Sequence, residues 1–258
     1  MSFLKYLIPA TLLAGLPALA YAGSHASGNL DPSDGVGISF WIISIAMVAA
    51  TVFFLMESLR VKGKWRTSLV VGSLVTLVAA VHYFYMRDVW VSTGASPTVF
   101  RYVDWIITVP LQMIEFYLIL AACTAIAGGV FWRLFVGSLV MLIGGYMGEA
   151  GYIQPFVGFI IGMAGWIYIL FGLFSGDAGQ AAAKSGNRSL KTAFSAMRII
   201  VTIGWAIYPL GYVFGYLTGG VDANALNIIY NLADFVNKIA FGLVIWAAAM
   251  QNTRLSSR

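Results

Sequence analysis

Seven long apolar segments, joined by short polar linkers, run through most of the 258 residues of this chain. Each is long enough to cross the bilayer's hydrocarbon core, which takes about 20 helical residues. Barrel strands would be shorter and would alternate apolar with polar residues. We therefore predict an all-α membrane protein, a bundle of seven transmembrane helices. The predicted spans are 36–59, 67–86, 98–122, 129–147, 152–174, 190–217 and 225–249.

Composition narrows the function classes. The chain is 60% hydrophobic and 10% charged, which is typical of membrane proteins. Its net charge of +5 comes from residues spread between apolar runs, so we expect no nucleic-acid partner. The single cysteine, Cys123, excludes an intrachain disulfide. No metal-spaced His or Cys cluster and no Ser/His/Asp nucleophile set occurs in the sequence, so we expect neither a metal site nor an enzyme.

The first 22 residues have the features of a signal peptide. One basic residue, Lys5, precedes an apolar stretch that ends in Ala20-Tyr21-Ala22, a small-x-small cleavage pattern. We expect cleavage after Ala22, which leaves 23–258 as one seven-helix transmembrane domain. The alternative is a retained extra span, although the apolar part is short for one.

Basic residues predict the orientation of the bundle. They cluster after the first span, between the fifth and sixth spans, and at the C-terminus. These residues are Arg60, Lys62, Lys64, Arg66, Lys184, Arg188, Lys191, Arg254 and Arg258. By the positive-inside rule the N-terminus lies outside and the C-terminus lies in the cytoplasm.

The second, third and seventh spans together contain six ionisable residues, in a setting where a charge is costly and by default marks a functional site. They are His82 in the second span, Arg101, Asp104 and Glu115 in the third, and Asp234 and Lys238 in the seventh.

The third span carries a polar stripe. Asp104 and Glu115 are eleven residues apart, which places them within roughly 20° of one helix face and about 16 Å apart along the axis. Arg101, Thr108 and Gln112 belong to the same face. Asp104 and Arg101 could also be a structural ion pair at the outer membrane surface.

Asp234 and Lys238, at positions i and i+4, can meet on one face of the seventh span. A structural ion pair is one interpretation of these two residues. The other follows from chemistry, because a lysine buried in an apolar span readily forms a Schiff base with a carbonyl compound. That second interpretation predicts a covalent cofactor.

Depth gives the charged residues a direction. With the predicted topology, Lys238 lies near the middle of the bilayer, Asp104 and Asp234 lie on the outer side, and Glu115 lies on the inner side. Glu115 has no evident cationic partner, so burial favours its protonated form and a role as proton donor. Asp104 shares its region with Arg101 and Lys238, which favour the ionised form and a role as proton acceptor.

The motifs RYVDWIITVPLQMIEFYLILAAC, GWAIYPLGY and YNLADFVNK identify a family. The chain resembles the microbial rhodopsins, and among them the proteorhodopsins of marine bacteria, over nearly its whole length after residue 22. The resemblance implies a light-driven outward proton pump of the bacterial inner membrane. It also implies all-trans retinal, bound as a protonated Schiff base on Lys238.

The resemblance also implies roles for individual residues. Asp104 would be the primary counterion and proton acceptor, Asp234 the second counterion, and Glu115 the cytoplasmic proton donor. Arg101 would help to keep the outer carboxylates ionised. Asp104, Thr108 and Glu115 occupy three positions from which ion selectivity is inferred in this family. Two of them, Asp104 and Glu115, carry carboxyl groups that can exchange protons, which favours protons as the transported ion.

Side chains that match the retinal pocket follow from the same resemblance. Trp105, Trp166, Trp205 and Tyr208 would wall the polyene, although aromatic residues at helical spacing are also common in cores. Gln112 matches a colour switch at which glutamine goes with blue absorption and leucine with green. We therefore expect a blue-absorbing form; the alternative is a glutamine that bonds a neighbouring helix.

The resemblance further implies an assembly. His82 matches a histidine that hydrogen-bonds the acceptor aspartate and reaches a tryptophan of the next protomer, and Trp41 matches that tryptophan. A ring-shaped homo-oligomer is the expected partner arrangement.

Two other functions stay open at this stage. One is a slow-cycling photosensory rhodopsin that signals to a partner, although such a sensor does not need the donor Glu115. The other is a transporter or structural membrane protein without retinal, which would leave Lys238 without a chemical role.

Overall fold

The computed structural model describes residues 30–255, so the predicted signal peptide at 1–22 lies outside the described residues. Within them, seven helical spans are long and apolar enough to cross a membrane, and the predicted seven-helix bundle is confirmed. The first four spans and the last are single helices. These are α2 (Gly35–Ser58), α3 (Lys64–Thr93), α4 (Thr98–Cys123), α5 (Gly129–Glu149) and α10 (Ala223–Leu255).

The fifth and sixth spans are interrupted. In the fifth, α6 (Pro155–Phe174) gives way to a short helix, α7 (Asp177–Lys184). The sixth contains α8 (Arg188–Ile199) and α9 (Ile207–Tyr212), each followed by a π-helical segment. The span predicted at 190–217 is confirmed as the helical span Arg188–Leu217, and its two π-helical segments are a detail that the apolar pattern does not show.

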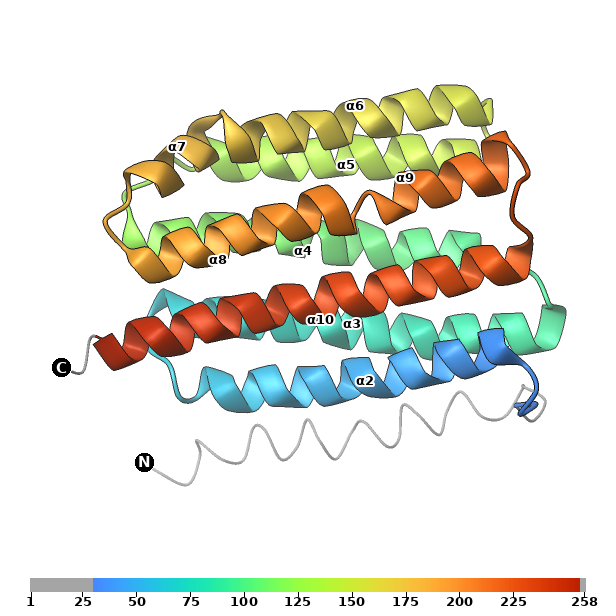
Figure 1. Ribbon diagram of the computed structural model, residues 1–258, viewed down its shortest axis with the longest axis horizontal. Coiled ribbons are helices and arrows are strands. Elements are labelled where there is room, and N and C mark those ends of the chain that lie inside the picture. The colour runs from blue at the N-terminus through green and yellow to red at the C-terminus, as the bar shows by residue number, and fades with distance from the viewer. Residues whose placement is uncertain (1–29, 256–258) are drawn as a thin grey trace.

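Successive membrane spans run antiparallel beside one another, and α10 closes the bundle against α2, α3 and α8 (Figure 1). One end of the bundle carries Arg60, Lys64, Lys184, Arg188 and Arg254, and we call it the basic end. The C-terminal ends of α2, α4 and α10 lie at the basic end, and the N-terminal ends of α3, α5 and α8 lie there too.

Local sequence sets where several helices begin and end. Asp34 caps α2, accepting a hydrogen bond from the Gly37 backbone N–H at 2.9 Å. Gly94 ends α3 with φ of +64°, a left-handed conformation that glycine adopts without strain. Pro155 begins α6, where a missing N–H costs no helical hydrogen bond.

The exposed surface is apolar and the interior is partly polar. Phe171 is 64% exposed and Ile203 is 69% exposed, whereas Arg101, Asp104 and Glu115 on α4 are all buried. Large exposed apolar side chains around the bundle are expected when lipid is the solvent. The polar stripe predicted on the third span therefore faces the interior, as expected.

Candidate functional site

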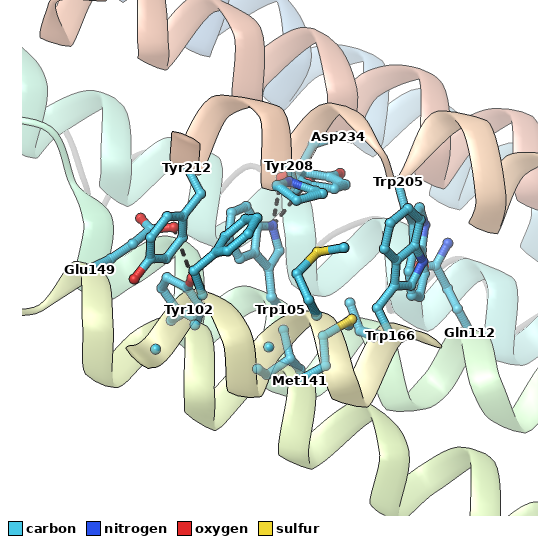
Figure 2. A pocket seen from close by; sticks show the side chains of 18 of the residues that line it. Tyr102, Trp105, Gln112, Met141, Glu149, Trp166, Trp205, Tyr208, Tyr212 and Asp234 are labelled. Atoms are coloured by element: carbon cyan, nitrogen blue, oxygen red, sulfur yellow. Dashed lines mark hydrogen bonds between the residues drawn. The ribbon is translucent and has the colours of Figure 1, made fainter. Parts of the chain in front are cut away.

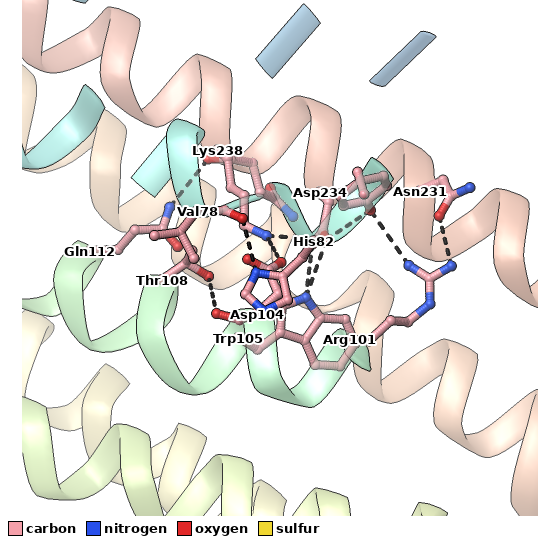
Figure 3. A network of polar contacts seen from close by, with 12 residues as sticks. Val78, His82, Arg101, Asp104, Trp105, Thr108, Gln112, Asn231, Asp234 and Lys238 are labelled. Carbon is pink, nitrogen blue, oxygen red and sulfur yellow. Dashed lines mark hydrogen bonds and ion pairs between the residues drawn. The ribbon is translucent and has the colours of Figure 1, made fainter. Parts of the chain in front are cut away.

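Lys238 of α10 and two aspartates form a buried ionic cluster in the middle of the bundle (Figure 3). The lysine is 3% exposed and both carboxylates are fully buried. Its Nζ pairs with Oδ2 of Asp104 on α4, and lies 3.2 Å from Oδ2 of Asp234 one turn away on its own helix. Burying charges is costly unless they are paired. The pair predicted within α10 is thus one half of a three-residue site.

Both carboxylate oxygens of Asp234 accept hydrogen bonds from neighbouring side chains. Tyr208 donates to Oδ1 at 2.6 Å and Tyr83 donates to Oδ2 at 2.8 Å. The indole N–H of Trp105 lies 3.1 Å and 3.2 Å from the two oxygens. Three side chains therefore donate hydrogen bonds to this one carboxylate.

The carboxylate of Asp104 accepts fewer hydrogen bonds than that of Asp234. Its only hydrogen-bond donor among residues 30–255 is Lys238, and its Oδ1 is buried without a partner. A buried oxygen without a donor is uncommon. Of the two carboxylates beside Lys238, Asp104 is therefore the one with a buried oxygen that receives no hydrogen bond from residues 30–255.

Arg101 lies one turn from Asp104 but forms no ion pair with it in the described residues. Its Nη2 donates to the side-chain oxygens of Asn227 and Asn231 on α10, at 2.7 Å each. Its Nη1 is 3.5 Å from the Tyr83 hydroxyl, which in turn bonds Asp234. The Arg101–Asp104 structural pair that the sequence left open is therefore wrong. The arginine charge is linked to Asp234 through Tyr83.

Next to the ionic cluster is an elongated cavity between α4, α5, α6, the sixth span and α10 (Figure 2). Lys238 and Asp234 line it, and along α4 the lining extends from Tyr102 to Gln112, about 15 Å at 1.5 Å per residue. The four aromatic residues predicted from the sequence all line it. They are Trp105, Trp166, Trp205 and Tyr208.

Most of the remaining lining is apolar or small, and includes Met141, Phe159 and Met163. Gly158 of this lining also allows α6 to pack closely against α5, because a Cβ on it would lie only 2.6 Å from the Cα of Gly148 on α5. A long cavity with apolar and aromatic walls and one amine is suited to an extended apolar molecule that carries a carbonyl group.

The irregular sixth span borders this cavity. The π-helical segment Ile200–Gly204 leaves carbonyl groups for side chains of neighbouring helices. Trp166 donates its indole N–H to the Val201 carbonyl at 3.0 Å, and Asn237 donates its amide to the Gly204 carbonyl at 2.9 Å. Asn237 directly precedes Lys238, so α10 binds the sixth span beside the ionic cluster.

Comparison with known proteins decides the family. Residues 34–252 match the family described as bacteriorhodopsin-like protein. The chain belongs to this rhodopsin family. A blue-light absorbing proteorhodopsin from Gamma-proteobacterium Hot 75m4 is 55% identical over 240 residues, which cover 92% of this chain and 94% of the relative.

Other relatives agree. A green-light absorbing proteorhodopsin from Gamma-proteobacterium EBAC31A08 is 51% identical over 97% of this chain and 99% of its own. The crystal structure of a blue light-absorbing proteorhodopsin from Med12 is 54% identical, with a TM-score of 0.75, and covers 85% of this chain and 100% of that one. The resemblance to microbial rhodopsins, and to the proteorhodopsins among them, is confirmed.

Five predicted site residues of this rhodopsin lie outside the cavity lining: Arg101 and Asp104, described above, and Thr108, Glu115 and His82. Thr108 is buried and donates its hydroxyl to the Asp104 carbonyl at 3.0 Å. Glu115 is fully buried near the basic end, and neither of its oxygens has a partner within residues 30–255. His82 lies beside Asp104 in Figure 3, but its Nδ1 pairs with the Val78 carbonyl at 2.9 Å. The expected hydrogen bond between His82 and Asp104 is thus absent from this structure.

Gln112 and Trp41 have contacts that bear on their predicted roles. Gln112 lines the cavity, and its Nε2 is 3.5 Å from the Asn237 carbonyl on α10. The colour-switch and helix-bonding interpretations of Gln112 are therefore both compatible with its position. Trp41 is 37% exposed on α2, with the Arg87 guanidinium 4.9 Å from its ring centre.

The sequence missed several residues of the site. Tyr83 donates a hydrogen bond to Asp234, and Asn227 and Asn231 accept hydrogen bonds from Arg101. None of the three is an acidic or basic residue that would mark it within a span. Glu149 lines the far end of the cavity, where the Tyr102 hydroxyl donates to it at 2.9 Å. Glu149 is the last residue of α5. A spacing rule for polar residues within spans would have found Asn227 and Asn231, four residues apart on one face.

Proposed function

We propose that this rhodopsin is a light-driven outward proton pump of the bacterial inner membrane, with all-trans retinal bound covalently to Lys238. The observation that supports it most is the unequal bonding of the two carboxylates beside Lys238. Asp234 receives hydrogen bonds from Tyr83, Trp105 and Tyr208, whereas Asp104 keeps one buried oxygen free. A pump needs one acceptor that changes its protonation and one anion that does not.

The residues present fit retinal. The cavity is long, walled by Trp105, Trp166, Trp205 and Tyr208, and ends at the only buried lysine of the described residues. When bound as a protonated Schiff base on Lys238, retinal supplies absorption of visible light and an isomerisation that drives the cycle. Gln112 in the lining supports a blue-absorbing form, because an amide dipole near the chromophore changes the relative stability of its ground and excited states.

Each proton transfer is carried out by particular residues of this chain. The carboxylate of Asp104, whose Oδ2 is paired with Lys238 Nζ, accepts the proton from that nitrogen, while Asp234 stays ionised because three side chains donate to it. Arg101, linked to Asp234 through Tyr83, keeps positive charge on that side of the lysine. Glu115 holds a proton in an apolar setting and returns it to Lys238. Thr108 donates to the backbone carbonyl of Asp104 and His82 lies beside Asp104, so both belong to the surroundings of the acceptor.

Direction follows from charge placement. The positive-inside rule puts the basic end in the cytoplasm. Glu115 lies on the side of Lys238 nearer the basic end, and Asp104 lies on the side of the opposite end. A proton that moves from Glu115 to Lys238 and from Lys238 to Asp104 therefore moves outward. The activity is transport of an ion and changes no substrate chemically.

A ring-shaped homo-oligomer is part of the proposal. Trp41 is exposed on the outer face of α2, and His82 is half-buried on the neighbouring helix α3. Such a position is suited to contact with a second copy. Native mass spectrometry of wild-type protein and of the Trp41→Ala variant tests this, and equal oligomer masses would contradict the contact.

The test of the pump is the external pH of intact cells that contain the protein with retinal. Illumination should acidify the medium, and a protonophore should abolish the change. The Asp104→Asn variant should give coloured cells without acidification. A pigment that cycles in light with no change in external pH would support the photosensor instead.

A further inference from the structure

A groove on the outer surface of the bundle lies between α5 and α6 near the basic end, where α6 gives way to α7. The two helices lie side by side at one edge of the bundle (Figure 1). The innermost lining is apolar and buried, whereas two aromatic side chains of α6 line the groove and remain 48% and 64% exposed. The buried residues are Val130, Leu134 and Ala178, and the aromatic residues are Tyr168 and Phe171.

Gly172 keeps this groove open, because it belongs to the lining and adds no side chain to it. A Cβ on Gly172 would lie 3.5 Å from Leu134 Cδ2, an ordinary contact distance. A larger side chain at this position would therefore extend into the groove. Apolar and aromatic walls that face the bilayer fit a hydrocarbon chain, so the acyl chain of a lipid is the ligand that suits this lining.

An ion pair between Arg133 on α5 and Asp177 on α7 lies at the mouth of the groove. The two side chains are 62% and 57% exposed, and neither has a second ion-pair partner within residues 30–255. The neighbouring Trp132 is 61% exposed, and tryptophans of membrane proteins are enriched at the level of the lipid headgroups. The ion pair is therefore placed where a headgroup can reach it.

Both charged side chains have capacity for another partner. Their pairing uses Nη1 of Arg133 and Oδ2 of Asp177, whereas a guanidinium has five N–H donors and a carboxylate has two oxygens. The remaining N–H groups suit a phosphate, which arginine binds through charge-assisted hydrogen bonds. The remaining carboxylate oxygen suits a primary ammonium with its three N–H donors. A cation beside an anion thus matches a headgroup that carries one charge of each sign.

We propose that this groove binds one phospholipid whose headgroup contains a phosphate and a primary ammonium. The phosphate lies against Arg133, the ammonium lies against Asp177, and an acyl chain runs along Tyr168 and Phe171. Asp177 repels an anionic headgroup that lacks the ammonium, and a quaternary ammonium has no N–H to donate. The bound headgroup joins α5 to α7. Binding of this lipid requires neither retinal nor proton transport.

Native mass spectrometry of the full-length protein in detergent tests the selectivity. The protein is titrated with phosphatidylethanolamine, phosphatidylglycerol or phosphatidylcholine, all with the same acyl chains. The wild type should bind one phosphatidylethanolamine about tenfold more tightly than either other lipid, the ratio expected from one charge-assisted hydrogen bond. Equal dissociation constants for the three lipids, or tighter binding of phosphatidylglycerol, would overturn the assignment.

Two variants separate the two charges. Asp177→Asn should remove the preference for phosphatidylethanolamine over phosphatidylglycerol, because an amide neither attracts the ammonium nor repels an anionic headgroup. Arg133→Gln should weaken the binding of all three lipids about tenfold. Arg60→Gln is the matched control, since Arg60 is another exposed arginine at the basic end and is paired with Glu57 on α2. If Arg133→Gln binds every lipid as tightly as Arg60→Gln does, the headgroup lies elsewhere and the proposal is wrong.

Gly172→Leu tests the acyl part of the site. The added side chain fills the groove and leaves both charged residues in place, so all three lipids should bind more weakly by a similar factor. Wild-type affinities in this variant would show that the acyl chain lies outside the groove. Circular dichroism checks that each variant is folded, and if Gly172→Leu is not, the charge variants decide. A changed oligomer mass in Arg133→Gln with unchanged lipid binding would show that a second copy covers the groove instead.

Discussion

The amide of Asn237 binds the carbonyl of Gly204 across the interface between α10 and the sixth span, at 2.9 Å. A Cβ on Gly204 would lie 2.0 Å from Asn237 Oδ1. This contact joins the residue before Lys238 to a π-helical segment next to Trp205. π-Helical segments are rare overall but recur at functional sites, and this contact ties the segment Ile200–Gly204 to the residue next to Lys238.

Gly204→Ala should therefore lower the stability of the folded protein. The added methyl displaces Asn237 and leaves a buried carbonyl without its donor, which costs about 1–3 kcal/mol. Thermal unfolding followed by circular dichroism measures the effect. Gly172→Ala is the control, since its Cβ would meet only Leu134 at 3.5 Å. Equal midpoints for both variants would show that the contact contributes nothing.

Lys238→Ala should abolish visible absorption after incubation with retinal, because the amine that forms the Schiff base is gone. Lys64→Ala, which removes a lysine at the basic end, should keep the wild-type spectrum. Absorption spectra of the two purified variants make the comparison. Retained colour in Lys238→Ala would place the linkage on another residue.

Gln112→Leu should move the absorption maximum to longer wavelength. The substitution removes an amide dipole from the cavity lining and keeps a side chain of similar size. Gln180→Leu, at an exposed position on α7, should leave the spectrum unchanged. If neither variant shifts the absorption maximum, Gln112 only bonds α10 and does not tune the colour.

Much of the fold follows from the sequence, and the reason is the bilayer. A span must be long and apolar, so the hydropathy pattern locates 98–122 to within one residue of α4 at Cys123. The same pattern placed the end of the second span at residue 86, whereas α3 continues to Thr93. Polar residues such as Arg87 and Asp88 continue a helix beyond the hydrocarbon core, where apolar composition no longer marks it.

The charged residues of the site were predicted, but their partners were not. Lys238, Asp104 and Asp234 stand out because ionisable residues are rare in spans. Tyr83 and Asn231 are ordinary polar residues in the sequence, and only the packing of α3 and α10 brings them to Asp234 and Arg101. The π-helical segments were missed because a shift from i+4 to i+5 hydrogen bonds leaves the apolar composition of the span unchanged.

Glu115→Gln should slow the return of the proton to Lys238 by at least about 100-fold, the lower end of what a positioned acid contributes. The first transfer, from Lys238 to Asp104, should keep its rate. Flash photolysis that follows the decay and recovery of the visible band separates the two steps. Unchanged recovery would show that the donor is a different group.

The central claim is that Asp104 takes the proton while Asp234 stays ionised. Time-resolved infrared difference spectroscopy tests it directly, since a newly protonated carboxylate gains a C=O stretching band. We predict that such a band rises after a flash in the wild type and in Glu115→Gln, and is absent from Asp104→Asn. A band that persists in Asp104→Asn would contradict the assignment of Asp104 as the acceptor.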